Sequence, residues 1–219
     1  MFINKSFSGL LFSFILLVFF LCSGCILSPQ TASDYSSHGM LYYGDCQYDQ
    51  AISDFNKAIE LDPQYANAYG GRGLTYIAKK QYELAIIDFS QVIELDPQST
   101  VPYFGRGLAY MEKNQCDSAI MDFNKVIELD PQHIEAYYVR GICYIKKKQY
   151  NLVIADFNKV IELNPQYADA YMRKAITYEI LGNNSEAIQN YKLFLQSAPS
   201  NESDIEKTKQ QIRKLGGAI

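Results

Sequence analysis

The feature that most constrains this chain is a regular repeat of 34 residues. Four similar segments begin at residues 54, 88, 122 and 156, and they read DFNKAIELDPQ, DFSQVIELDPQ, DFNKVIELDPQ and DFNKVIELNPQ. A proline recurs with the same step, at Pro63, Pro97, Pro131, Pro165 and Pro199. Because a proline ring cannot continue a helix, each of these residues predicts a helix end. A chain with such a period folds as a linear array in which each unit packs on its neighbours.

Aromatic and small residues follow the same period and predict two helices in each unit. Two tyrosine series lie seven residues apart, which places both on one face of a first helix. They are Tyr35, Tyr69, Tyr103, Tyr137 and Tyr171, and Tyr42, Tyr76, Tyr110, Tyr144 and Tyr178. A second helix carries small or branched residues four positions before large aromatic ones, again on one face. These are Ala51, Ala85, Ala119, Val153 and Ala187, and Phe55, Phe89, Phe123, Phe157 and Tyr191.

The order Tyr, Gly, Tyr, Ala, Phe, Pro within 34 residues resembles the tetratricopeptide repeat, a helix-turn-helix unit. The resemblance implies an all-α, right-handed solenoid. Five units fit, at residues 32–65, 66–99, 100–133, 134–167 and 168–201. Gly39, Gly73, Gly107, Gly141 and Ala175 fall where the first helix presses on the second, and we expect them to face the alanines of that helix.

After the fifth unit, residues 202–216 are expected to form a capping helix. Ser203 and Glu206 make a capping box at its start. Ile205, Ile212 and Leu215 form a thin apolar stripe, so one face can cover the last unit while the others meet water.

The first residues of the chain are interpreted as an export signal. Residues 7–27 form an uncharged and mostly apolar run, and Leu21-Cys22-Ser23-Gly24-Cys25 resembles the bacterial lipobox. On this interpretation residues 1–24 are a lipoprotein signal peptide, Cys25 carries the lipid and residues 25–31 are a tether. Cys22 departs from the usual leucine. An uncleaved signal anchor and ordinary cleavage stay open, since a run of this length can span a bilayer.

Each of these alternatives places the rest of the chain beyond the membrane. Lys5 is the only basic residue before Lys57, so the positive-inside rule keeps the N-terminus in the cytoplasm. If Cys25 is lipidated, Ile26 follows it instead of the aspartate that marks inner-membrane retention in Gram-negative lipoproteins. We therefore expect a lipid-anchored protein of the bacterial envelope, on the outer membrane facing the periplasm. A signal-anchored or secreted protein is the alternative.

Charge and composition argue against nucleic-acid binding and catalysis. The net charge is −4 with no block of lysine or arginine, so no basic stripe is available for phosphates. The 2 histidines and 5 cysteines form no cluster with metal-ligand spacing. No nucleophile–base or paired-carboxylate arrangement emerges. We expect no enzyme activity, no cofactor and no metal.

One charged pattern also follows the repeat. Arg72, Arg106 and Arg140 are each followed sixteen residues later by Asp88, Asp122 and Asp156. Lys174 replaces the arginine in the fifth unit, and Asn190 replaces the aspartate there. This covariation predicts an Arg–Asp link between the two helices of a unit. Such a row is either a structural ladder or a set of receptors for carboxylates.

The resemblance further implies a concave face lined by the first helix of each unit. Its predicted lining is largely apolar and suits a hydrophobic helix or an extended segment of a partner. The residues are Met40, Tyr43, Leu74, Ile77, Phe104, Leu108, Met111, Tyr138, Ile142, Ile145, Met172 and Ile176. Packing on neighbouring units, or self-association, is the alternative role for these side chains.

The predicted function is a non-catalytic, membrane-tethered adaptor that binds a protein or peptide. Resemblance at the level of architecture points to envelope assembly: pili, outer-membrane proteins or the recruitment of peptidoglycan hydrolases. A self-associating scaffold and a surface-exposed or secreted factor that binds host proteins remain as alternatives.

Overall fold

The computed structural model describes residues 30–197 and 202–218. Cys25 and the predicted signal peptide at 1–24 lie outside the described residues. Within the described part, eleven helices form five helix-turn-helix pairs and one further C-terminal helix. They are α2 (Ala32–Gly44), α3 (Tyr48–Leu61), α4 (Ala66–Ala78), α5 (Tyr82–Leu95), α6 (Thr100–Glu112), α7 (Cys116–Leu129), α8 (Ile134–Lys146), α9 (Tyr150–Leu163), α10 (Ala168–Ile180), α11 (Asn184–Ser197) and α12 (Glu202–Lys214).

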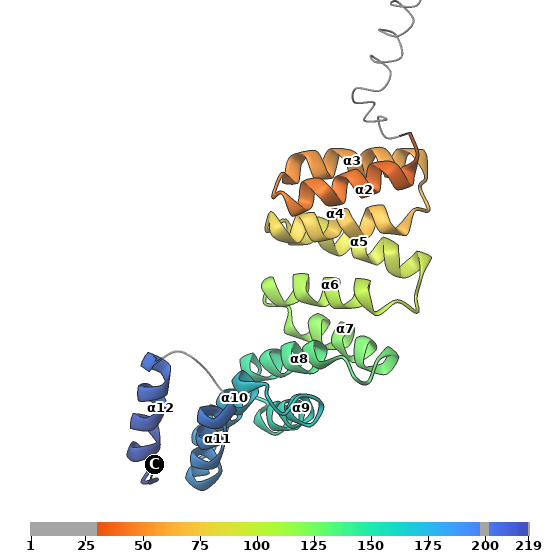
Figure 1. Ribbon diagram of the computed structural model, residues 1–219. Helices are drawn as coiled ribbons and strands as arrows, with labels where there is room; N and C mark the ends of the chain where they lie inside the picture. The colour runs from red at the N-terminus through yellow and green to blue at the C-terminus, as the bar shows by residue number, and fades with distance from the viewer. Residues whose placement is uncertain (1–29, 198–201, 219) are drawn as a thin grey trace, which may run out of the picture.

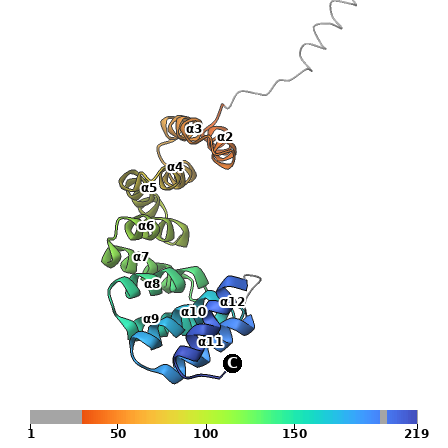
Figure 2. The same cartoon turned by 90° about the vertical axis from the view of Figure 1, so that its left-hand side faces the viewer.

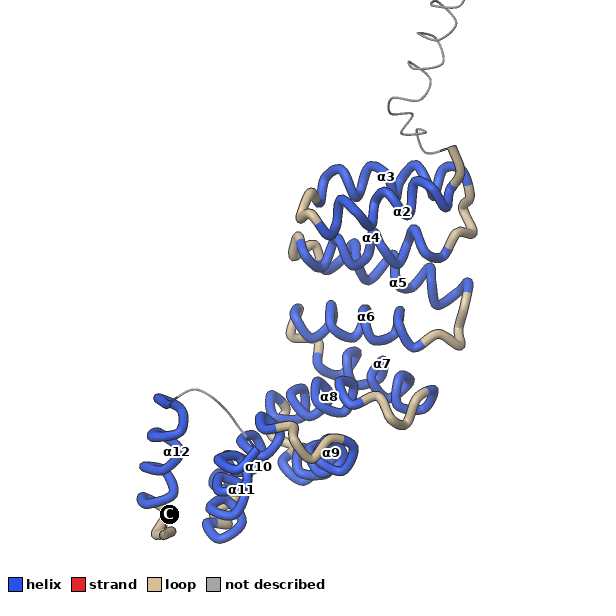
Figure 3. The backbone as a smooth tube through the Cα atoms, viewed as in Figure 1, coloured by secondary structure: helices blue, strands red, loops and turns tan. Residues whose placement is uncertain are grey.

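The pairs stack one on the next, which confirms the predicted all-α solenoid (Figure 1). The helix direction turns along the stack: α2 to α5 run across the view, whereas α9 is seen nearly along its axis. The view from the side shows the same stack as an arch that ends in α10, α11 and α12 (Figure 2). Helices and short loops account for the whole described part (Figure 3). From α4 on, the first helix of a pair lies between its own second helix and the second helix of the preceding pair.

The turn inside each pair requires one residue in the left-handed backbone region. Lys80 has a φ of 59°, and its N–H donates to the carbonyl of Ile77 at 2.8 Å. The N–H of Gln81 closes the turn on the carbonyl of Tyr76 at 2.8 Å. Cys46, Asn114, Lys148 and Gly182 occupy the corresponding place. A non-glycine residue is strained there, so only the fifth pair has the residue best suited to this turn.

The recurring tyrosines and prolines fasten each pair to the preceding one. The hydroxyl of Tyr69 donates to the carbonyl of Pro63 at 3.2 Å. The same bond recurs in the next three pairs, at 3.3 to 3.4 Å, from Tyr103 to Pro97, Tyr137 to Pro131 and Tyr171 to Pro165. The first tyrosine series thus fixes the place where the chain passes from one unit to the next.

The centre of each of the first four pairs is a buried phenylalanine, at position 55, 89, 123 or 157. These rings also lie closest to the glycines of the first helices. A Cβ built on Gly107 would lie 2.6 Å from the ring of Phe123, and one on Gly39 would lie 2.9 Å from the ring of Phe55. The glycines therefore make room for a ring of the second helix, and the nearest atoms belong to this ring instead of the alanines.

Helix α12 packs on the fifth pair through Ile212, which is completely buried together with Ala175, Ala187 and Tyr191. The side-chain amide of Gln211 donates to the Glu179 carboxylate at 2.5 Å. Among the described helices, none has both the length and the apolar character needed to cross a bilayer.

Candidate partner-binding surface

The predicted lining of the concave face lies on α2, α4, α6, α8 and α10, with two or three residues from each helix. None of the twelve side chains is fully buried, and Met40 and Ile176 are the most exposed, at 44% and 43%. Most of the others also touch the core; Phe104, Leu108 and Met111, for example, pack against the cluster around Phe123. Each first helix therefore presents a partly accessible apolar edge that its own core holds in place.

At the N-terminal end of this face the surface is hollowed between α2, α4, α5 and α6. The hollow has a volume of about 450 Å³. Met40 and Leu74 line it, and they are the only predicted groove residues that do. Ser36, Tyr65, Gly70, Phe89, Asp96 and Ser99 also contribute to its wall. These six are not among the predicted lining residues, although Ser36 and Gly70 occupy the same place in their repeats as Phe104 does in its own.

Further along the concave face, aromatic side chains fill the corresponding space. The Phe104 ring lies 5.9 Å from that of Phe123 and 4.9 Å from that of His133, measured between centroids. The Tyr138 ring lies 5.7 Å from Phe157 and 5.2 Å from Tyr167. The predicted lining thus has a hollow between its first two units, and aromatic rings occupy the corresponding space at the third and fourth.

Tyr138 is also held by a polar contact. Its hydroxyl donates to the Asp169 carboxylate, which accepts a second bond from Nε of Arg173 at 3.1 Å. Burial raises the pKa of Tyr138 to about 12, and the bond to Asp169 adds to this effect. The hydroxyl is therefore a hydrogen-bond donor at any physiological pH.

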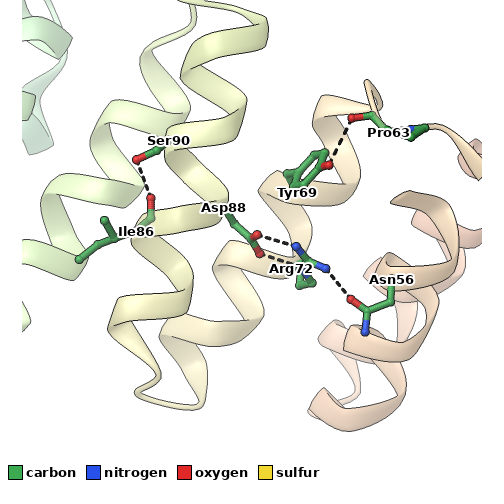
Figure 4. A network of polar contacts seen from close by, with 7 residues as sticks. All are labelled: Asn56, Pro63, Tyr69, Arg72, Ile86, Asp88 and Ser90. Atoms are coloured by element: carbon green, nitrogen blue, oxygen red, sulfur yellow. Dashed lines mark hydrogen bonds and ion pairs between the residues drawn. The ribbon is translucent and has the colours of Figure 1, made fainter. Parts of the chain in front are cut away.

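The predicted Arg–Asp links are present in the second, third and fourth repeats. Nε and Nη2 of Arg72 donate to the two carboxylate oxygens of Asp88 at 2.8 and 2.7 Å, and Nη1 donates to Asn56 of the preceding repeat at 2.5 Å (Figure 4). Arg106 binds Asp122 and Ser90 in the same way, and Arg140 binds Asp156 and Asn124. We call these contacts the arginine ladder. Its donors are taken up inside the solenoid, which favours the structural role over the receptor role.

Burial sets the energetics of the arginine ladder. It raises the pKa of the Asp88 carboxyl, and the hydrogen bonds from Arg72 oppose that rise. The same bonds raise the pKa of Arg72 above its usual range. Removal of the arginine would leave a carboxylate with 2% exposure and no charged partner. In the first repeat, Nδ1 of His38 lies 2.6 Å from the Asp54 carboxylate and takes the place of the arginine.

The fifth repeat lacks this contact. Lys174 makes no ion pair among the described residues, and burial lowers its pKa. Asn190 is 5% exposed; its Nδ2 donates to the carbonyl of Glu186, while its Oδ1 has no hydrogen-bond partner within residues 30–197 and 202–218. A buried oxygen without a donor lowers stability.

A second set of ion pairs joins the second helix of one repeat to the C-cap residue of the first helix in the next repeat. Lys79 binds Asp49, Lys147 binds Asp117, and Lys113 binds Glu83 at 2.8 Å. At the junction of the fourth and fifth repeats the corresponding residues are Asn151 and Leu181, so no ion pair forms there. We call these contacts the lysine bridges.

Three cysteines lie in the described part of the chain. Cys46 is exposed, whereas Cys116 and Cys143 are buried in one cluster and carry free thiols. Burial, aided by the neighbouring Cys116, raises the pKa of Cys143 to about 12. The described residues contain no group of three side chains suited to hold a metal ion.

Comparison with known families identifies the repeat. Tetratricopeptide repeat models match residues 66–99 and 134–167, and residues 157–189. A related model, described as TPR repeat, matches residues 39–80 and 107–148. The chain is a tetratricopeptide-repeat protein. Such repeats form scaffolds that bind proteins or peptides, and the family is typically non-catalytic.

Solved structures of other tetratricopeptide-repeat proteins share the fold. A crystal structure of MamA is 24% identical, with a TM-score of 0.71, and the match covers 78% of this chain and 96% of MamA. YrrB, described as a TPR protein with an unusual peptide-binding site, is 23% identical with a TM-score of 0.70, and the match covers 81% of this chain and 92% of YrrB. PilF of Pseudomonas aeruginosa is 18% identical with a TM-score of 0.68, and the match covers 84% of this chain and 88% of PilF. A comparison with curated protein sequences finds no match.

Proposed function

We propose that this chain is a membrane-tethered, non-catalytic adaptor that binds an apolar helix or extended segment of a partner along its concave face. The observation that carries the proposal is the row of partly exposed apolar side chains on five consecutive first helices. An apolar surface of this extent is typical of an interaction site, and a row along consecutive first helices suits an elongated ligand.

The chemistry of the concave face favours an apolar ligand over an acidic tail. One structural neighbour, the first TPR of Spaghetti (RPAP3), is bound to the HSP90 peptide SRMEEVD; it is 25% identical with a TM-score of 0.53, and the match covers 57% of this chain. Here the hollow at the start of the face contains Asp96 as its only charged lining residue. A negative lining repels an acidic peptide, so we propose a different partner class for this chain.

Membrane attachment is the second part of the proposal. The lipobox-like sequence before Cys25 supports a lipid anchor, with the repeats facing the periplasm from the outer membrane. An adaptor at that place would serve envelope assembly: pili, outer-membrane proteins or peptidoglycan hydrolases. Metabolic palmitate labelling of the full chain and of Cys25→Ala, with membrane fractionation, tests the anchor. We expect labelling of the natural chain alone; equal labelling of both, or of neither, would contradict lipidation at Cys25.

The test of the concave face is cross-linking in the native cell, followed by identification of the captured protein. Leu108→Glu with Ile142→Glu places two carboxylates on α6 and α8, and we expect capture of the partner to be lost. Leu84→Glu with Leu152→Glu is the matched control, because these leucines lie on the second helices and are 41% and 45% exposed. Both variants should keep the helical circular-dichroism signal. Capture that survives the first pair of substitutions and fails with the control would move the site to the second helices.

A self-associating scaffold is the second candidate. Ile87 and Met121 are 63% and 72% exposed on α5 and α7, the second helices of neighbouring repeats. A second copy that covers them would remove apolar surface from water. Light scattering should then show a mass that rises with concentration in the natural chain and falls to that of a monomer in Ile87→Glu with Met121→Glu.

A further inference from the structure

One position of the repeat carries a small side chain in the first two units and a large one in the other three. Positions 36, 70, 104, 138 and 172 correspond in the five repeats, and they hold Ser, Gly, Phe, Tyr and Met. In the third repeat, Phe104 lies between Phe123 and His133. The corresponding residues of the second repeat are Gly70, Phe89 and Ser99, and all three line the hollow. The hollow therefore includes the space that an aromatic ring occupies in the next repeat.

Packing does not require glycine at position 70. A Cβ built on Gly70 meets nothing within 4 Å, and its φ lies outside the left-handed region. Gly71 differs, since its Cβ would lie 2.5 Å from the ring of Phe55. A glycine inside a helix lowers stability relative to alanine. Gly70 thus keeps the hollow open at a cost to α4, with no gain in internal packing.

Two polar groups of the hollow are available to a ligand. Ser36 is 5% exposed, and its side chain has no hydrogen-bond partner among the residues that the structure describes. Asp96 lies at the rim and forms no ion pair within the described part of the chain. Its Oδ1 accepts one bond from the backbone N–H of Gln98 at 3.1 Å, which leaves Oδ2 available. A hydroxyl in the wall and a carboxylate at the rim would complement a peptide that carries a positive charge.

We propose that the hollow receives an aromatic side chain of the partner segment, with a lysine or arginine beside it that pairs with Asp96. This deepens the function proposed above and rests on it. The partner ring would take the place beside Phe89 and Ser99 that corresponds to the place of Phe104 beside Phe123 and His133, and Tyr65 supplies a further aromatic ring to the wall of the hollow. Aromatic rings pack favourably at centroid distances of about 4.5 to 7 Å. The volume of about 450 Å³ accommodates such a side chain together with its flanking backbone.

The chain contains no tryptophan, which permits a direct measurement. The probe is an acetylated and amidated hexapeptide with a central Trp-Lys pair between alanines, titrated with the full chain in detergent micelles. We expect a blue shift of the tryptophan emission and a rise in its anisotropy, beyond those caused by micelles alone. A competitor with Phe-Lys at the centre should reverse both signals, and one with Ala-Lys should not.

Three variants assign the signal to the hollow. Gly70→Phe should weaken binding roughly tenfold, because the chain then supplies its own ring, as it does at Phe104. Gly70→Ala is the matched control and should bind like the natural chain, since its Cβ enters open space. Asp96→Asn should weaken the Trp-Lys probe about two- to fivefold and leave a Trp-Gln probe unchanged. Because Asp96 is exposed, this variant tests the proposal even if Gly70→Phe fails to fold.

The outcomes separate this inference from the proposed function. No signal, or equal binding to the natural chain and folded Gly70→Phe, overturns the inference. Capture of the partner that is lost in Leu108→Glu with Ile142→Glu but kept in Gly70→Phe also overturns it, while the concave-face function stands. A dimer of the chain alone that Gly70→Phe dissociates would assign the hollow to a second copy and would likewise contradict it.

Discussion

The second, third and fourth repeats each contain an arginine that binds a carboxylate of its own repeat and a polar side chain of the preceding one, whereas the fifth has Lys174 and Asn190 without that contact. The lysine bridges follow the same division, since they end before Asn151 and Leu181. The tyrosine–proline bonds and buried aromatic residues continue through all of these repeats. Apolar packing and backbone contacts therefore define the repeat, and ionic contacts distinguish one repeat from another.

The largest effect is expected from the arginine ladder. Arg106→Ala should lower the free energy of unfolding by about 3–5 kcal/mol, because Asp122 stays buried without a partner. Lys174→Ala in the fifth repeat should cost less than about 1 kcal/mol, since no ion pair is lost. Urea unfolding of the full chain in detergent, followed by circular dichroism, measures both. Equal losses of unfolding free energy in the two variants would mean that the arginine ladder contributes no more to stability than Lys174 does.

A smaller effect is expected from the small residue under the buried ring. Gly107→Ala should destabilise the chain because its Cβ would lie 2.6 Å from Phe123, and overpacking costs about 1–3 kcal/mol against a helix gain of about 1 kcal/mol. The fifth repeat already has alanine here, so Ala175→Gly should cost about 0.5–1 kcal/mol through helix propensity and about 0.8 kcal/mol more for the loss of its buried methyl group. The same unfolding measurement applies. A stabilised Gly107→Ala variant would show that the ring can move at no cost.

The arginine ladder can also be extended into the fifth repeat. Lys174→Arg with Asn190→Asp recreates the pair found in the three preceding repeats and gives the buried acceptor a charged donor. We expect a coupling energy of about 1 kcal/mol in a double-mutant cycle, with the double variant more stable than either single one. Hydrogen exchange of residues 168–197 should slow at the same time. Additive single effects would show that the two side chains do not meet.

The smallest effect is expected from a new lysine bridge. Asn151→Asp with Leu181→Lys places opposite charges at the junction of the fourth and fifth repeats, where the three preceding junctions have them. Because such pairs are partly exposed, the gain should be about 0.2–1 kcal/mol and should fall as salt is added. Thermal unfolding at low and high salt measures it. A gain that does not depend on salt would indicate a packing effect of the substitutions.

Much of this fold is predictable because the residues that determine each structural feature recur in every repeat. The prolines, tyrosines and phenylalanines predict every hairpin, and the covariation of Arg72, Asp88, Lys174 and Asn190 predicts the arginine ladder and its end. The sequence does not predict that Phe123 is the closest neighbour of Gly107. The period shows which face of a helix is buried, but it does not show how far a ring extends from the second helix toward the first. The hollow was missed for the opposite reason. It arises because Ser36 and Gly70 lack the large side chain found at the corresponding positions of the later repeats, and a missing side chain gives no periodic signal.

The Tyr and Arg contacts have a consequence for chain length. Arg106 is satisfied by Ser90 before it and Asp122 after it, and each of its counterparts uses the same sixteen-residue offset in both directions. Excision of residues 100–133 would present Arg140 to Ser90 and Tyr137 to the carbonyl of Pro97, so both contacts could re-form across the joint. The internal repeats are therefore interchangeable in the contacts that they make with their neighbours. The distance from α2 to α12 can thus change by whole repeats without a new kind of interface.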